Sequence, residues 1–280
     1  MNKHHYLALW LNGFHKVNYF TWGHPNPNRT TIAVHGLTRN AHDFDFLAQH
    51  LSKDYHVICP DIVGRGLSDW LRNKTDYGYP LYLSDMASLI SRLNVDSVNW
   101  IGTSMGGIIG MMLAAQENSP IKKLVINDVG THISATALQR LAKYVGLNPT
   151  FSSLRDAEDY FRKTYSSFGN LTDEQWRHMT VHGVFKTKDG LYQLSYDPAI
   201  VNVFNVQPIV DIDLSYFWLK ITCPVLLIRG KESDLLSKNT VNWMKMSKPS
   251  MKFVEFDDCG HAPHLMSTEH VQIIKEFLDE

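Results

Sequence analysis

The stretch Val98–Gly110 reads VNWIGTSMGGIIG and decides the fold of this 280-residue chain. Val98–Ile101 has the pattern of a buried strand, and Gly107–Ala115 has that of a buried helix. The five residues between them, GTSMG, match the motif G-x-S-x-G. Between a strand and a helix this motif forms a sharp turn that exposes its central side chain, and its small outer residues let the two elements approach closely. Ser104 is therefore a candidate nucleophile, although a glycine-rich helix start with a capping serine would have a similar pattern.

On both sides of this stretch, predicted strands alternate with predicted helices, which is typical of a mostly parallel sheet covered on both faces. Two strands around a turn at Asn12-Gly13 come first. The predicted strands are Tyr6–Leu11, Lys16–Trp22, Thr31–Val34, Tyr55–Cys59, Ser97–Ile101, Lys123–Asn127, Pro224–Arg229 and Met251–Phe256. The predicted helices are Phe44–Leu51, Leu81–Leu93, Gly106–Glu117 and Glu269–Leu278. These elements predict an α/β core.

The alternation stops in the middle of the chain. Helix-like segments there are followed by a turn-rich stretch: Ala135–Val145, Leu154–Phe168, Thr172–Val181 and Lys186–Pro198. We predict that residues 1–130 and 220–280 form the core and that 131–219 form an inserted helical cap, a common way to close a pocket. Aromatic side chains of the insertion indicate either an apolar pocket or the cap's own core: Phe151, Trp176, Phe185, Tyr192, Phe204 and Trp218.

A serine hydroxyl is a poor nucleophile until a neighbouring base takes its proton. Of fourteen histidines, His261 is the best candidate, because it lies in the loop Asp258–Pro263 directly after the last predicted strand. Loops that follow parallel strands converge at one edge of the sheet, where Ser104 is expected. His264 lacks a preceding glycine and is the weaker choice.

A carboxylate must then orient the imidazole. Asp234 follows the predicted strand Pro224–Arg229 and is the favoured candidate. Asp128, directly after Lys123–Asn127, is the alternative acid, and Glu232 is a third choice.

Backbone N–H groups are also needed to stabilise an oxyanion. The N–H of Met105, which follows Ser104, is one expected donor. The N–H of Leu37 is the other, because the loop His35-Gly36-Leu37 follows the strand Thr31–Val34. The same loop could also be a simple turn that ends the strand.

Composition excludes several other classes of protein. The chain has 27 basic and 28 acidic residues, a net charge of −1, and therefore no charge excess that would favour nucleic acid. Its apolar runs are too short for a membrane span, and the expected location is cytoplasmic. Cys59, Cys223 and Cys259 predict neither a disulfide framework nor a zinc site.

Together these residues resemble the α/β-hydrolase superfamily over nearly the whole chain. Asp61–Asp69, DIVGRGLSD, is similar to that superfamily's D-x-x-G-x-G-x-S loop. The resemblance implies that Asp61 and Arg65 tie loops together near the site. Asn127–Gly130, NDVG, resembles a bacterial subgroup of esterases and unspecified hydrolases, except that Thr131 replaces that subgroup's proline.

The expected activity is hydrolysis of a carboxylic ester through an acyl-enzyme on Ser104, with no metal and no organic cofactor. Haloalkane dehalogenases and epoxide hydrolases of the superfamily have Asp in place of this serine. The alternatives with the same triad are a C–C bond hydrolase of ring-cleavage diketones, a thioesterase and a lactonase. A non-enzymatic receptor for a small ligand is another. The expected partner is a small-molecule ester, with no nucleic acid and no membrane span; a homodimer is compatible with the sequence.

Overall fold

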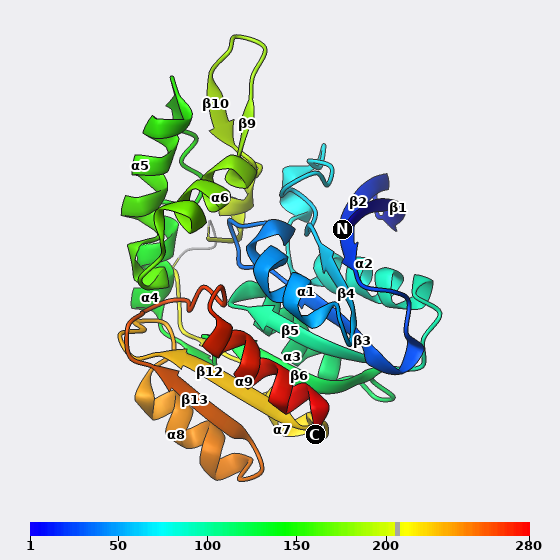
Figure 1. The fold of residues 1–280 in the computed structure, drawn as a ribbon. Coiled ribbons are helices and arrows are strands. Elements are labelled where there is room, and N and C mark those ends of the chain that lie inside the picture. The colour runs from blue at the N-terminus through cyan, green and yellow to red at the C-terminus, as the bar shows by residue number, and fades with distance from the viewer. Residues whose placement is uncertain (205–207) are drawn as a thin grey trace.

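The computed structural model describes residues 1–204 and 208–280, and Figure 1 shows a central sheet with helices on both faces and further helices above one edge. The sheet has eight strands in the order β1-β2-β4-β3-β5-β6-β12-β13. Their bounds are Asn2–Trp10, Gly13–Trp22, His56–Pro60, Thr30–Val34, Val98–Thr103, Ile121–Asn127, Val225–Gly230 and Lys252–Phe256 in that order. Neighbouring strands are parallel from β4 to β13, while β2 is antiparallel to both β1 and β4. The predicted α/β fold is confirmed.

The two faces of the sheet bury different side chains of the same strands, as the alternation of side chains along a strand requires. On one face, Ala33, Ile101 and Val125 join the buried cluster that contains residues of α1 (Asp45–Leu51) and α9 (Thr268–Asp279). On the other face, Ile32, Trp100 and Leu124 join the cluster that contains residues of α2 (Tyr79–Arg92), α3 (Met105–Ala114) and α8 (Lys238–Ser247). Strands buried on both faces explain the continuous apolar runs in the sequence.

The register of the sheet brings two strand ends together. Thr103, the last residue of β5, lies opposite Asn127, the last residue of β6. Because parallel strands end at the same edge, Ser104 and Asp128 leave the sheet side by side. On the other side of β6, Ile228 of β12 lies opposite Asn127.

The residues between β6 and β12 contain most of the remaining elements. They comprise β7 (His132–Ile133), α4 (Ala135–Ala142), β8 (Thr150–Phe151), α5 (Leu154–Thr164), η4 (Ser166–Phe168), α6 (Asp173–Gly183), β9 (Val184–Lys186), β10 (Tyr192–Leu194), η5 (Pro198–Phe204), β11 (Ile212–Asp213) and α7 (Ser215–Lys220). In Figure 1, α4, α5, α6 and the β9–β10 hairpin stand beyond the carboxyl ends of the central strands. The division into a core and a cap at residues 130 and 220 stays a prediction.

At two places the structure differs from the predicted elements, and at a third it fits the core alternative for an aromatic residue. The turn-rich stretch Lys186–Pro198 contains β10, which pairs with both β9 and β8 in a small antiparallel sheet. Helix α8 was not predicted, because its buried apolar residues, Val241 and Met244, are too few to give a clear helical period. Trp218 of α7 does not belong to a pocket wall; its ring is fully buried and its indole N–H donates to Ser247 Oγ at the end of α8, 2.9 Å away.

Candidate active site

Ser104 lies at the tip of the turn between β5 and α3, with φ 51° and ψ −112°. A positive φ is costly for a residue other than glycine, and such strain is characteristic of functional turns. Two glycines make the turn possible. A Cβ on Gly102 would lie 2.2 Å from the carbonyl oxygen of Gly106, and a Cβ on Gly106 would lie 2.0 Å from that of Val34. The motif therefore packs strand, turn and helix against each other as its sequence predicts.

His261 lies on the loop after β13 and faces this serine. Its Nε2 is 3.0 Å from Ser104 Oγ, and its Nδ1 is 2.7 Å from Asp128 Oδ2. An ionised carboxylate only accepts hydrogen bonds, so Nδ1 carries the proton and Nε2 is free to accept the serine hydroxyl. This tautomer is the one that a general base for Ser104 requires.

Asp128 is fully buried at the end of β6, and three donors hold its carboxylate. Gly230 N–H donates to Oδ1 at 2.9 Å, and Ser233 Oγ donates to Oδ2 at 2.6 Å, beside His261. Gly230 is the last residue of β12 and Ser233 lies in the loop after it, so the end of this strand and its loop position the carboxylate instead of supplying it. A Cβ on Gly230 would lie 2.2 Å from the Gly260 carbonyl oxygen, which shows how closely this loop packs on the loop of His261.

The expected contact between Asp234 and His261 is wrong. The side chain of Asp234 is half exposed and forms an ion pair with Arg140 of α4, whose Nη2 donates to Asp234 Oδ1 at 2.9 Å. Asp128, the alternative candidate, occupies the position beside the imidazole. The physical reason is the register described above: β6 is the strand next to β5, so a residue that directly follows it needs no loop to approach the imidazole at Ser104.

Two other side chains near His261, the weaker candidate His264 and the thiol of Cys259, have other partners or are unreactive. His264 Nδ1 accepts the backbone N–H of Met266 at 2.9 Å, and burial lowers the pKa of this histidine. Cys259 is buried, and burial with the nearby charges of Asp258 and Asp128 raises the pKa of its thiol to about 12. The thiol therefore stays protonated and unreactive near neutral pH.

The loop with Leu37 lies next to the serine, as predicted. A Cβ on Gly36 would be 3.8 Å from Ser104 Cβ, and Leu37 lines the same cavities as Ser104. His35 holds this loop. Its ring is fully buried, Nε2 accepts the N–H of Ile62 at 3.0 Å, and Nδ1–H donates to the carbonyl of Gly36 at 2.7 Å. Burial lowers the pKa of His35 to about 4, so the ring is neutral and keeps both hydrogen bonds.

Arg65 and Asp61 tie loops together at the same place. Arg65 is fully buried, and its Nε donates to the carbonyl of Leu37 at 2.8 Å while Nη1 donates to Tyr82 Oη at 2.9 Å. Asp61 accepts the N–H groups of Ala41 and Leu67, both at 2.9 Å. These contacts agree with the structural role that the resemblance implied.

The insertion contacts the loop of His261 directly. Gly260 N–H donates to the carbonyl of Ser167 at 2.7 Å, and Ser167 Oγ donates in return to the carbonyl of His261. Farther along, Gln175 Nε2 donates to the carbonyl of Met266 at 2.7 Å. The position of the imidazole therefore depends on residues of η4 and α6 as well as on the sheet.

Two cavities meet at Ser104. A small one of about 60 Å³ lies between the loop of Leu37, the loop of His261 and the helices above them, and Arg140, Tyr165 and Met179 line it. A larger one of about 460 Å³ has mostly apolar walls, formed among others by Met105, Ile108, Ile133, Leu141 and Tyr79. Of the aromatic residues proposed for an apolar pocket, Phe204 lines the larger cavity, while Phe151, Trp176 and Trp218 are buried in the hydrophobic core.

Replacing Ser233 with alanine tests whether the loop after β12 positions the carboxylate. We expect kcat to fall about tenfold and the free energy of unfolding to fall by about 1–3 kcal/mol, because Asp128 loses one of its buried donors. Steady-state turnover and thermal unfolding measure the two effects. Ser250→Ala, in an exposed turn, is the matched control and should leave both unchanged. Wild-type kcat in the Ser233→Ala protein would contradict the positioning role.

The described residues contain no helix that is both long and apolar enough to cross a bilayer.

A family model for the alpha/beta hydrolase fold matches residues 32–267, which is most of the chain. The chain belongs to the α/β-hydrolase family. It is thus a hydrolase of the α/β fold, and the family that its motifs resemble is confirmed.

Individual relatives within the α/β-hydrolase family cover almost the whole chain. The 3-hydroxybutyrate-oligomer hydrolase of Cupriavidus necator is 40% identical over 274 residues, which are 95% of this chain and 93% of that protein. A solved structure from Rickettsia typhi matches with a TM-score of 0.92 at 34% identity, over 99% and 98% of the two chains. An alpha/beta hydrolase structure from Novosphingobium aromaticivorans matches with a TM-score of 0.89 at 29% identity, over the same shares.

Proposed function

We propose that the protein is a serine hydrolase that cleaves carboxylic esters, with Ser104, His261 and Asp128 as its catalytic triad. The observation that carries the proposal is the continuous chain of hydrogen bonds from Ser104 Oγ through His261 to the buried carboxylate of Asp128. This arrangement has the order nucleophile, base and acid that acyl transfer requires.

In the proposed reaction, Ser104 Oγ attacks the carbonyl carbon of the ester while His261 Nε2 takes its proton. The negative charge that develops on the carbonyl oxygen would be stabilised by the N–H groups of Leu37 and Met105. Met105 is the first residue of α3, so its N–H is one of the groups at a helix start that lack an intrahelical acceptor, and the helix dipole favours negative charge there. His261 then protonates the leaving alcohol, and water releases the acid from Ser104 by the same steps.

The substrate that fits best is a short oligoester of a hydroxy acid. The relative from Cupriavidus necator has the name of a hydrolase of 3-hydroxybutyrate oligomers. Such a substrate has apolar methyl-bearing units and one terminal carboxylate. The apolar walls of the larger cavity suit the former. Arg140, which lines the small cavity at Ser104 and already pairs with Asp234, suits the latter if it shares its guanidinium with the substrate.

The test is hydrolysis of 3-hydroxybutyrate dimer and trimer, measured as released monomer, together with labelling by a fluorophosphonate probe and peptide mapping. We expect release of monomer and labelling at Ser104. Labelling at Ser104 together with cleavage of simple esters alone would support the serine hydrolase proposal and contradict the oligoester substrate. A protein that is neither labelled nor active on esters, thioesters, lactones or ring-cleavage diketones would favour the non-enzymatic receptor.

Replacing Arg140 with glutamine tests the role of the terminal carboxylate. We expect KM for 3-hydroxybutyrate dimer to rise about tenfold, because a charge-assisted hydrogen bond is lost, with little change in kcat. The kinetic constants for p-nitrophenyl butyrate, which has no carboxylate, should stay unchanged. Equal effects on both substrates would show that Arg140 acts through packing and not by binding the carboxylate.

A further inference from the structure

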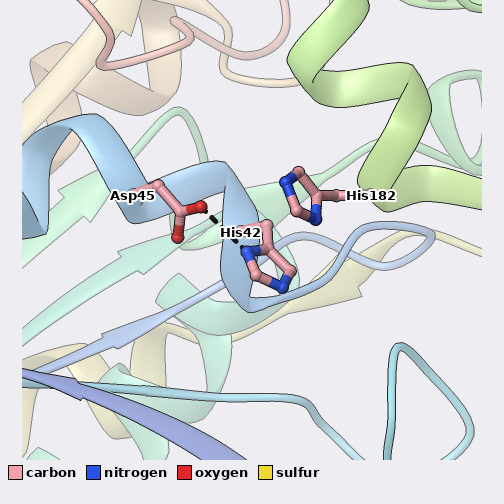
Figure 2. Close-up of side chains that lie close together, drawn as sticks. All are labelled: His42, Asp45 and His182. Carbon is pink, nitrogen blue, oxygen red and sulfur yellow. Dashed lines mark hydrogen bonds and ion pairs between the residues drawn. The ribbon is translucent and has the colours of Figure 1, made fainter. Parts of the chain in front are cut away.

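Three histidines and one aspartate gather where the insertion rests on the core. His42 lies in η2 (Ala41–Phe44), and Asp45 is the first residue of α1. His178 and His182 lie one turn apart on α6, so their side chains project from the same face of that helix. Figure 2 shows how His182 approaches His42 and Asp45 from the opposite element. Among the described residues that line the two cavities at Ser104, none of these four occurs.

The ligand atoms of this cluster are close to one another. His42 Nδ1 lies 2.8 Å from Asp45 Oδ2, and His178 Nε2 lies 3.4 Å from the same oxygen. One ligand atom each from His42, Asp45 and His182 lie within 4.8 Å of one another. A tetrahedral zinc ion with bonds of about 2.0–2.1 Å would hold its ligand atoms roughly 3.3 Å apart. Rotation of the His182 ring would bring its nitrogen to metal distance together with His42 and Asp45. His178 Nε2 lies 3.1 Å from the carbonyl oxygen of His42 and would have to exchange that contact for the ion.

The carboxylate of Asp45 lacks a permanent cation. Over residues 1–204 and 208–280, its ion pairs are with His42 and His178, which carry charge only when protonated. Its second oxygen, Oδ1, is buried and has no hydrogen-bond partner among these residues. A buried carboxylate oxygen without a donor is costly, and a cation bound through Oδ1 would remove that cost.

We propose that His42, Asp45, His178 and His182 bind a divalent transition-metal ion of the zinc class. Three imidazoles and one carboxylate are ligands that zinc accepts, and four protein ligands are typical of a structural site. His42 and His182 line an open cavity of about 630 Å³, which gives the ion a path from solvent. The rings of His42 and His182 are stacked with centroids 3.8 Å apart, so the His182 ring must turn until its lone pair points at the ion.

Such an ion would fasten α6 to α1 without taking part in the reaction. Met179 lies between the two histidines of α6 in sequence and lines the small cavity at Ser104. Metal binding would therefore fix one wall of that cavity. The cysteines gave no sign of this site; the signals in the sequence are two histidines four residues apart and a histidine three residues before an aspartate.

The test is a titration of the full chain with Zn²⁺ in competition with a chromophoric chelator at neutral pH. We expect one Zn²⁺ per chain and a rise in Tm of roughly 5 °C when free Zn²⁺ is a hundredfold above Kd. His182→Gln and Asp45→Asn should each weaken binding about tenfold or more and remove most of the rise in Tm. Far-UV circular dichroism of the metal-free proteins checks that both variants fold.

Two controls separate this site from other histidines. His50→Gln changes an exposed histidine on α1, and His261→Gln removes the imidazole at Ser104; both should keep the stoichiometry and affinity of the wild type. Absence of stoichiometric Zn²⁺ binding would overturn the proposal. So would binding that His182→Gln and Asp45→Asn leave intact, or binding that His261→Gln abolishes.

Discussion

Ser104→Ala protein is expected to lose on the order of 10⁴ to 10⁶ in kcat on p-nitrophenyl butyrate and on hydroxybutyrate oligomers. The reason is that the acyl-enzyme cannot form without the hydroxyl that lies 3.0 Å from His261 Nε2. Steady-state turnover, with the purified variant tested for contaminating wild-type activity, measures the loss. Labelling by a fluorophosphonate should disappear at the same time.

Ser119→Ala is the matched control, because Ser119 lies outside the site and its hydroxyl accepts the nearby N–H of Ile121. It should keep wild-type turnover and labelling. Turnover within a few fold of wild type in the Ser104→Ala protein would show that another group performs the reaction and would remove the serine mechanism.

Asp128→Asn is expected to lower kcat by on the order of 10⁴, whereas Asp234→Asn should stay within about threefold of wild type on a neutral ester. The carboxylate of Asp128 accepts from Gly230 N–H, Ser233 Oγ and His261 Nδ1 at once. An amide has only one oxygen, so asparagine cannot accept from donors on both sides. Its NH₂ would either face the Gly230 N–H or turn towards His261 and select the tautomer whose Nε2 carries the proton.

The Asp128→Asn and Asp234→Asn variants are matched controls for each other, because both aspartates follow strands of the same sheet and the substitution is the same. Asp234 pairs with Arg140 at the surface, and surface ion pairs contribute little to stability. Steady-state kinetics of both variants, with thermal unfolding to check folding, decide between them. A larger loss of kcat for Asp234→Asn than for Asp128→Asn would require the acid to be reassigned to the position that the sequence favoured.

The sheet and the nucleophile turn were predictable because their signals are local. The strand end, the glycines and the helix start around Ser104 all lie within one short stretch, and strands buried on both faces have plain apolar runs. His261 was predictable because it follows the last strand of the sheet directly. In each of these cases a residue's position relative to its own element was enough.

The carboxylate beside His261 could not be chosen in this way, because Asp128 and Asp234 both follow a strand and both strands end at the same edge. The choice depends on the order of strands in the sheet, in which β6 lies next to β5 and β12 lies one strand farther away. It also depends on partners that are distant in sequence, such as Gly230 and Ser233 for Asp128 and Arg140 for Asp234. Strand order and such pairings are tertiary properties that one sequence does not specify locally.

The segment from Gly230 to Asp234 does not supply the carboxylate beside His261. It needs to present one peptide N–H and one hydroxyl to Asp128, and its own aspartate lies outside the hydrogen-bond chain. Position 234 acts through its ion pair with Arg140 and is open to adaptation towards new substrates, whereas position 128 is constrained by the imidazole, the peptide of Gly230 and its own buried surroundings. Variation among descendants of this protein should thus accumulate at the outer aspartate and spare the inner one.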